Sequence, residues 1–156
     1  MQIKTFIAAA ILFIMTACGN SETVSRIPDA SVNLRANIDY YGLTTPYTFK
    51  SFTSKQGLPE SSFLGYGGIL LVGGISFNGD LVAYYAYDLS CPVEARPDVR
   101  VVINNELLQA ECPKCKSRFA VFEGGGFPVY GEAKTNSLYM KQYKTRLSGR
   151  DILISR

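Results

Sequence analysis

The sequence predicts an all-β domain, built as an antiparallel sandwich or barrel. Ten tyrosines and nine phenylalanines, together with many β-branched residues, favour strands over helices. Short apolar or alternating runs recur at close spacing, and glycine, asparagine and proline separate them. No stretch has the periodicity of a convincing amphipathic helix. The length of 156 residues indicates one folded domain.

The first predicted strands lie in the N-terminal half of the chain. Residues 32–39 alternate between apolar and polar side chains, which is typical of a half-buried strand. Residues 40–59 are aromatic and polar, and their glycines and prolines predict a loop with short extended pieces. Residues 69–72 form a continuous apolar run between two glycine pairs, which predicts a short buried strand between turns.

The remaining strands follow in quick succession. Asn78-Gly79-Asp80 predicts a tight turn. Residues 81–89 then form a partly alternating strand that leads into Cys91. A glycine triplet at 124–126 predicts a turn rather than a phosphate-binding loop, because no helix start follows it. Further strands are expected at 99–103, from Leu107 to Cys112, at 138–143 and at 151–154.

The N-terminus has the pattern of an export signal. Lys4 precedes an apolar stretch at 6–15 that is too short to span a bilayer, and no twin-arginine pair is present. The following Met15-Thr16-Ala17-Cys18 resembles the lipobox of bacterial lipoproteins. We therefore predict a signal peptide at 1–17, lipidation of Cys18, a flexible tether at 18–30 and a domain at 31–156. An ordinary secretory signal is the alternative.

These features also predict location and partners. Lipid chains on Cys18 would anchor the protein to a membrane of the bacterial cell envelope. Gly19 is not the aspartate that retains some lipoproteins in the inner membrane, so the outer membrane is favoured. The net charge of +3 is small and no Lys/Arg run is present, which argues against nucleic-acid binding. The sequence does not identify a redox partner or another protein partner in the envelope.

Three cysteines lie in two loops, Cys91-Pro92-Val93 and Cys112-Pro113-Lys114-Cys115. A Cys-x-x-Cys turn chelates a metal, forms a redox disulfide or has neither role. The chain has no histidine, so a fourth metal ligand would be water or an oxygen donor such as Asp88, Glu94 or Glu111. Apart from that role, we expect Asp88 and Glu94 to be charged loop residues that are exposed to solvent. No catalytic residues are predicted, since no serine–base pair or carboxylate dyad has a recognisable spacing.

The second cysteine loop and the residues after it resemble Rieske ferredoxin domains. Cys112-Pro-Lys-Cys-Lys-Ser-Arg-Phe119, a glycine-bearing turn and a final hairpin follow the pattern Cys-Pro-x-His-Gly-x-x-Phe of that family. The resemblance covers about residues 65–156 and implies a β-sandwich that holds a 2Fe-2S cluster on two cysteines and two histidines. Cys91 and Cys112 stand at the cysteine positions, whereas Val93 and Cys115 stand at the histidine positions.

Two functions follow from this resemblance. The first is a membrane-anchored, exported Rieske-like iron–sulfur domain of electron-transfer ancestry, with Cys91, Cys112 and Cys115 as altered metal ligands and Val93 as a lost ligand position. The second is a cluster-free envelope module, in which zinc or a disulfide (Cys91–Cys112 or Cys112–Cys115) occupies the former cluster site. In neither case do we expect an enzyme that acts alone.

Overall fold

The computed structural model describes residues 25–76 and 81–156. The predicted signal peptide, the lipidation site Cys18 and the predicted turn at 78–80 lie outside these residues. Among the residues described, no helix has the length and apolarity needed to cross a bilayer. The antiparallel all-β class with two cysteine-bearing loops is confirmed.

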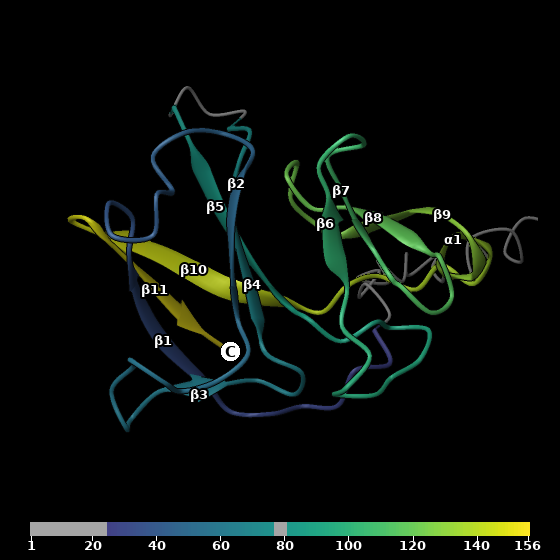
Figure 1. The fold of residues 1–156 in the computed structure, drawn as a ribbon, viewed down its shortest axis with the longest axis horizontal. Coiled ribbons are helices and arrows are strands. Elements are labelled where there is room, and N and C mark those ends of the chain that lie inside the picture. The colour runs from purple at the N-terminus through teal and green to yellow at the C-terminus, as the bar shows by residue number, and fades with distance from the viewer. Residues whose placement is uncertain (1–24, 77–80) are drawn as a thin grey trace, which may run out of the picture.

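A seven-stranded antiparallel sheet forms the larger half of the domain (Figure 1). Its strand order is β2-β4-β5-β10-β11-β1-β3. The C-terminal hairpin, β10–β11, therefore lies between β5 and β1. The strands are β1 (Val32–Asn37), β2 (Thr48–Phe52), β3 (Phe63–Leu64), β4 (Ile69–Gly74), β5 (Ala83–Asp88), β10 (Gln142–Ser148) and β11 (Asp151–Ser155).

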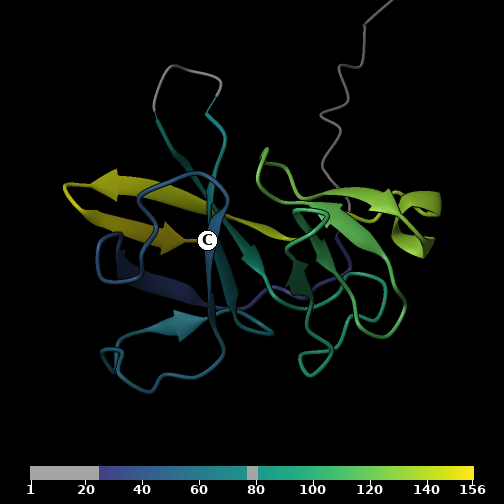
Figure 2. The same cartoon turned by 45° about the horizontal axis from the view of Figure 1, so that its top comes forward.

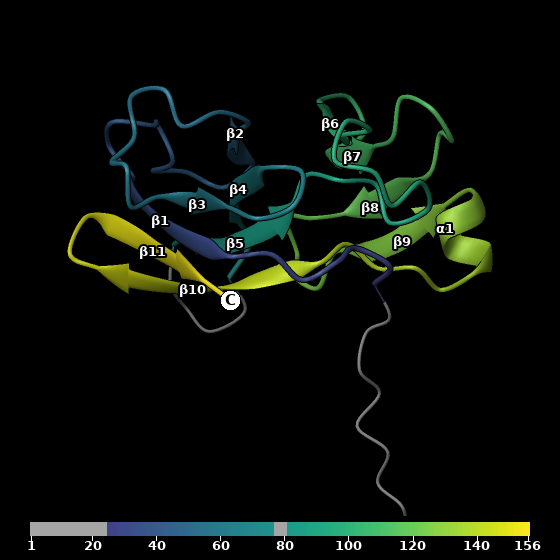
Figure 3. The ribbon, with the colours of Figure 1, turned by 90° about the horizontal axis from the view of Figure 1, so that it is seen from below.

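A smaller antiparallel sheet lies beside the large one, at the side opposite the β10–β11 turn (Figures 2 and 3). Its order follows the chain, β6-β7-β8-β9, and a single helical turn, α1, comes directly after β9. The elements are β6 (Val102–Asn104), β7 (Gln109–Glu111), β8 (Arg118–Ala120), β9 (Phe127–Tyr130) and α1 (Glu132–Thr135).

The β4–β5 hairpin separates two apolar cores. Side chains alternate across a strand, so Leu70 and Val72 face one core while Ile69 and Leu71 face the other. Both faces of β4 are therefore buried, which explains its continuous apolar sequence. We call the cluster that contains Cys91, Cys112, Phe119, Phe122 and Met140 the cysteine core, and the cluster that contains Leu34, Phe52, Tyr143, Ile152 and Ile154 the sheet core.

Most predicted strands are present, but several boundaries differ. The alternation in β1 is confirmed. We expected the glycine pair Gly73-Gly74 to form a turn after the strand. Instead, these glycines are the last two residues of β4. A Cβ atom on Gly74 would lie 2.1 Å from the carbonyl oxygen of Phe122, so glycine is needed there for close packing and not for a turn.

Two further expected strand segments are absent from the structure. Leu107 and Leu108 form a turn instead of starting a strand, because the Asn104 side chain accepts hydrogen bonds from the N–H groups of Glu106 and Leu107. The stretch 138–141 is not a strand either, and β10 begins only at Gln142. The four-residue helix α1 was not predicted from the sequence.

Candidate metal centre

The two cysteine loops have the same backbone shape. The first follows β5, and the second connects β7 to β8. In each loop the N–H group four residues after the first cysteine donates to that cysteine's carbonyl oxygen: Ala95 to Cys91 at 2.8 Å, and Lys116 to Cys112 at 3.0 Å. Ala95 and Lys116 both have positive φ, 49° and 60°. Each Cys-Pro sequence therefore begins a matching tight turn.

These two turns bring three thiols together. The sulfur atoms of Cys91, Cys112 and Cys115 all lie within 4.8 Å of one another, and the Cys91 and Cys115 sulfurs are 3.6 Å apart. Cys91 and Cys112 are fully buried, and Cys115 is partly exposed. All three are free thiols. The three cysteines of the predicted site thus form one cluster, which reaches solvent at Cys115.

Backbone N–H groups point at the two buried sulfurs. The Cys91 sulfur accepts hydrogen bonds from Val93 and Glu94, and the Cys112 sulfur accepts them from Lys114 and Cys115. Burial raises the pKa of both thiols, and these hydrogen bonds act in the opposite direction because they favour the thiolate. The loops therefore carry the donors that a metal-bound thiolate needs, while the burial keeps the metal-free thiols protonated.

Cys115 has a different environment. Burial would raise the pKa of Cys115, but hydrogen bonds from the hydroxyl and backbone of Ser117, and from the other two thiols, lower it below its ordinary value. Ser117 is fully buried, and its hydroxyl oxygen also accepts the N–H of Ala133 in α1 at 3.1 Å. Sequence reasoning did not identify Ser117, because its role depends on α1, which lies 16 residues further along the chain.

The residues present do not fit a complete Rieske centre. Val93, at the first histidine position, is half-buried against the cysteine core and offers no ligand atom. Cys115, at the second histidine position, has its sulfur 3.6 Å from that of Cys91. A Rieske cluster places its two cysteines on one iron and its two histidines on the other. Here all three sulfurs surround one point.

The oxygen donors considered as a fourth ligand are engaged elsewhere. Asp88 is fully buried, not solvated as predicted, and accepts N–H groups from Tyr66, Gly67 and Ser90 and the hydroxyl of Tyr143. Glu94, with its side chain only 14% exposed, forms an ion pair with Lys114 that joins the two loops. The carboxylate of Glu111 accepts a 3.4 Å hydrogen bond from Asn104.

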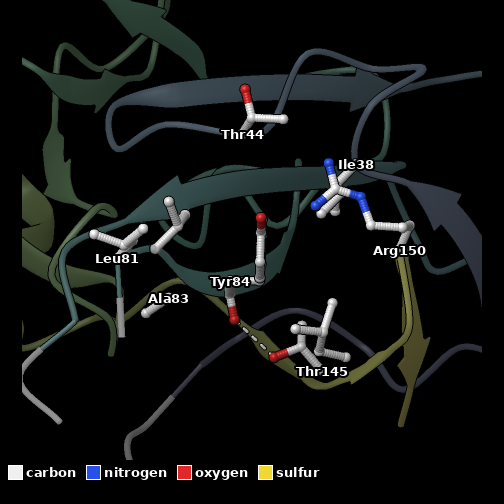
Figure 4. Close-up of a pocket in the computed structure, with 9 residues that line it drawn as sticks. Ile38, Thr44, Leu81, Ala83, Tyr84, Thr145 and Arg150 are labelled. Carbon is white, nitrogen blue, oxygen red and sulfur yellow. Dashed lines mark hydrogen bonds between the residues drawn. The ribbon is translucent and has the colours of Figure 1, made fainter. Parts of the chain in front are cut away.

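A cavity of about 470 Å³ lies at the other end of β5, away from the cysteines (Figure 4). Several of the polar groups around it are bonded within the fold. Thr145 donates to the carbonyl oxygen of Tyr84 at 2.7 Å, and Arg150 forms an ion pair with Asp39. Its other lining residues are Ile38, Thr44, Leu81, Val82, Ala83 and Leu147. The cavity therefore offers little specific chemistry.

Comparisons with known proteins give a similarity in fold but no match to a family. No protein-family model matches the sequence, and no curated protein matches it. A solved structure of the ferredoxin of carbazole 1,9a-dioxygenase from Nocardioides aromaticivorans IC177 is similar in fold. The two chains are 23% identical, the match covers 80% of this chain and 98% of that one, and the TM-score is 0.48.

Proposed function

We propose that this protein is a metal-binding domain of the bacterial cell envelope, of Rieske-like descent, with Cys91, Cys112 and Cys115 as its metal ligands. The convergence of these three thiols is the observation that carries the proposal. Two turns of the same shape, from separate parts of the chain, aim their sulfurs at one point and supply N–H donors to them. Electron transfer is the ancestral role that the cysteine loops suggest.

Metal and sulfide analysis tests this proposal. The full chain should be purified without a chelating tag, and its iron, zinc, copper and acid-labile sulfide measured per chain. We expect bound metal in the wild type and none in the triple variant in which Cys91, Cys112 and Cys115 are replaced by serine. Metal that persists in the triple variant, or a wild type that binds none after anaerobic reconstitution, would contradict the proposal.

The second candidate function is a metal-free envelope module with a disulfide at this site, and the 3.6 Å contact between Cys91 and Cys115 favours it. This pair is poised to form a disulfide in an oxidising compartment. It is not one of the two pairings considered from the sequence, which were Cys91–Cys112 and Cys112–Cys115. Non-reducing mass spectrometry would then show a mass lower by two hydrogen atoms, and peptide mapping would join these two cysteines.

Membrane anchoring at Cys18 is a separate part of the proposal, and the lipobox-like sequence supports it. Cells that express the full chain should incorporate labelled fatty acid into the protein. The Cys18→Ser variant should lose the label and leave the membrane fraction. A wild type that carries no label would leave the ordinary secretory signal as the explanation for the N-terminus.

A further inference from the structure

The number of available ligands limits which metal suits the thiol cluster. A metal ion about 2.3 Å from each sulfur separates the sulfurs by about 3.8 Å in a tetrahedral site and about 4.0 Å in a trigonal one. The separations here, 3.6 Å for Cys91–Cys115 and at most 4.8 Å for any pair, suit one shared ion. Small side-chain movements would equalise them.

A fourth protein ligand is missing from this cluster. Among the residues the structure describes, no carboxylate or histidine joins the three cysteines as a ligand group. Asp88 holds backbone N–H groups in place, and recruiting Glu94 would break its ion pair with Lys114. Structural zinc sites are almost always four-coordinate, so this set is one ligand short for zinc.

The buried side of the cluster is apolar. Cys91 and Cys112 belong to the cysteine core, together with Leu89, Leu138 and Met140. Val93 packs against the same core at the position where the Rieske pattern has its first histidine. An ordered water molecule needs polar partners, and this apolar shell supplies few of them. Water is therefore a poor fourth ligand on the buried side.

We propose that Cys91, Cys112 and Cys115 form a three-thiolate site for a single soft monovalent metal ion, with copper(I) as the natural occupant, and not a site for a 2Fe-2S cluster. Soft thiolate ligands suit copper(I), zinc and iron–sulfur clusters. Of these, copper(I) is the one that is satisfied by three ligands. Each thiol loses its proton on binding. The N–H donors on Cys91 and Cys112 stabilise the negative charge of the thiolates. This inference rests on the proposed function and specifies its metal.

Copper(I) binding tests the inference directly. The full chain, reduced and free of metal, is titrated anaerobically with copper(I) against a coloured copper(I) chelator, and copper X-ray absorption gives the coordination. We expect one copper(I) per chain with three sulfur neighbours. Single serine substitutions of Cys91, Cys112 or Cys115 should each lower the affinity more than about 100-fold, beyond the usual loss for residues outside the ligand shell. Cys18→Ser is the matched control and should bind normally.

Two comparisons make the result decisive. Val93→His adds an imidazole beside the cluster and should raise the affinity for zinc relative to copper(I); an unchanged ratio would argue against an open position at this point. Two irons and two sulfides per chain, or zinc preferred over copper(I) in the wild type, would overturn the inference while leaving the proposed function intact. If no metal of any kind binds, both fail.

Discussion

Removing the buried carboxylate of Asp88 should destabilise the domain strongly. Its oxygens accept hydrogen bonds from the N–H groups of Tyr66 at 2.8 Å, Gly67 at 3.1 Å and Ser90 at 2.8 Å. They also accept the hydroxyl of Tyr143 at 2.7 Å. Asp88→Ala leaves four donors without their partner, and the space that remains is closed to solvent because Asp88 is fully buried.

The size of the effect follows from these four donors. A buried donor left unsatisfied costs about 1–3 kcal/mol, so the sum is about 4–12 kcal/mol. Relaxation and water entry reduce such sums, and single substitutions seldom exceed about 4–5 kcal/mol. We expect Asp88→Ala to lower the free energy of unfolding by about 4 kcal/mol. Asp88→Asn keeps one acceptor oxygen and should cost about 2 kcal/mol.

Urea unfolding of the reduced, metal-free chain measures this change. With a slope of about 2 kcal/mol per molar urea, a loss of about 4 kcal/mol lowers the midpoint by about 2 M. Asp98→Ala is the control, because Asp98 is exposed and pairs with Arg96 on the surface. It should leave the midpoint unchanged. If Asp88→Ala and Asp98→Ala gave the same midpoint, the assigned role of the buried carboxylate would be refuted.

Three more predictions follow from single contacts. Gly74→Ala puts a Cβ atom 2.1 Å from a backbone carbonyl oxygen and should cost about 3 kcal/mol or more, whereas Gly42→Ala, with open space and φ of 67°, should cost about 1 kcal/mol; equal losses in urea unfolding would contradict this. Ser117→Ala removes a hydrogen bond that favours the Cys115 thiolate, so the pKa of Cys115 should rise and its alkylation should begin at higher pH; an unchanged pH profile in the metal-free protein would exclude this role. Lys141→Met removes bonds to the segment before β1, which should then be cut faster by a protease, with the unfolding midpoint nearly unchanged; cleavage at the wild-type rate would show that these bonds do not hold the segment.

Much of the strand pattern could be predicted because it depends on local periodicity. The alternation of β1 and the apolar run of β4 both correspond to strands in the structure. The length of β4 could not be predicted, because Gly74 pairs with Ala83 of β5 and lies against Phe122, a residue far along the chain. A glycine that allows close packing and a glycine that forms a turn look alike in a sequence.

The sequence indicated which cysteines share the two loops, but not how their side chains contact one another. The two Cys-Pro sequences marked both loops, and the structure brings all three thiols together. The contact between Cys91 and Cys115 depends on how the large and small sheets pack, so that pair could not be preferred from the sequence. The tie between Ser117 and α1 was missed because a four-residue helix has no periodicity to detect.

The β4–β5 hairpin also has a consequence for how the domain responds to its ligand. Leu70 and Val72 line the cysteine core, and their neighbours Ile69 and Leu71 line the sheet core. The loss of either core would leave the strand that both cores share packed on one face only, so both should unfold as one cooperative unit. An ion bound at the cysteines would therefore slow amide exchange as far away as the C-terminal β10–β11 hairpin. The distant strands would report whether the metal is present.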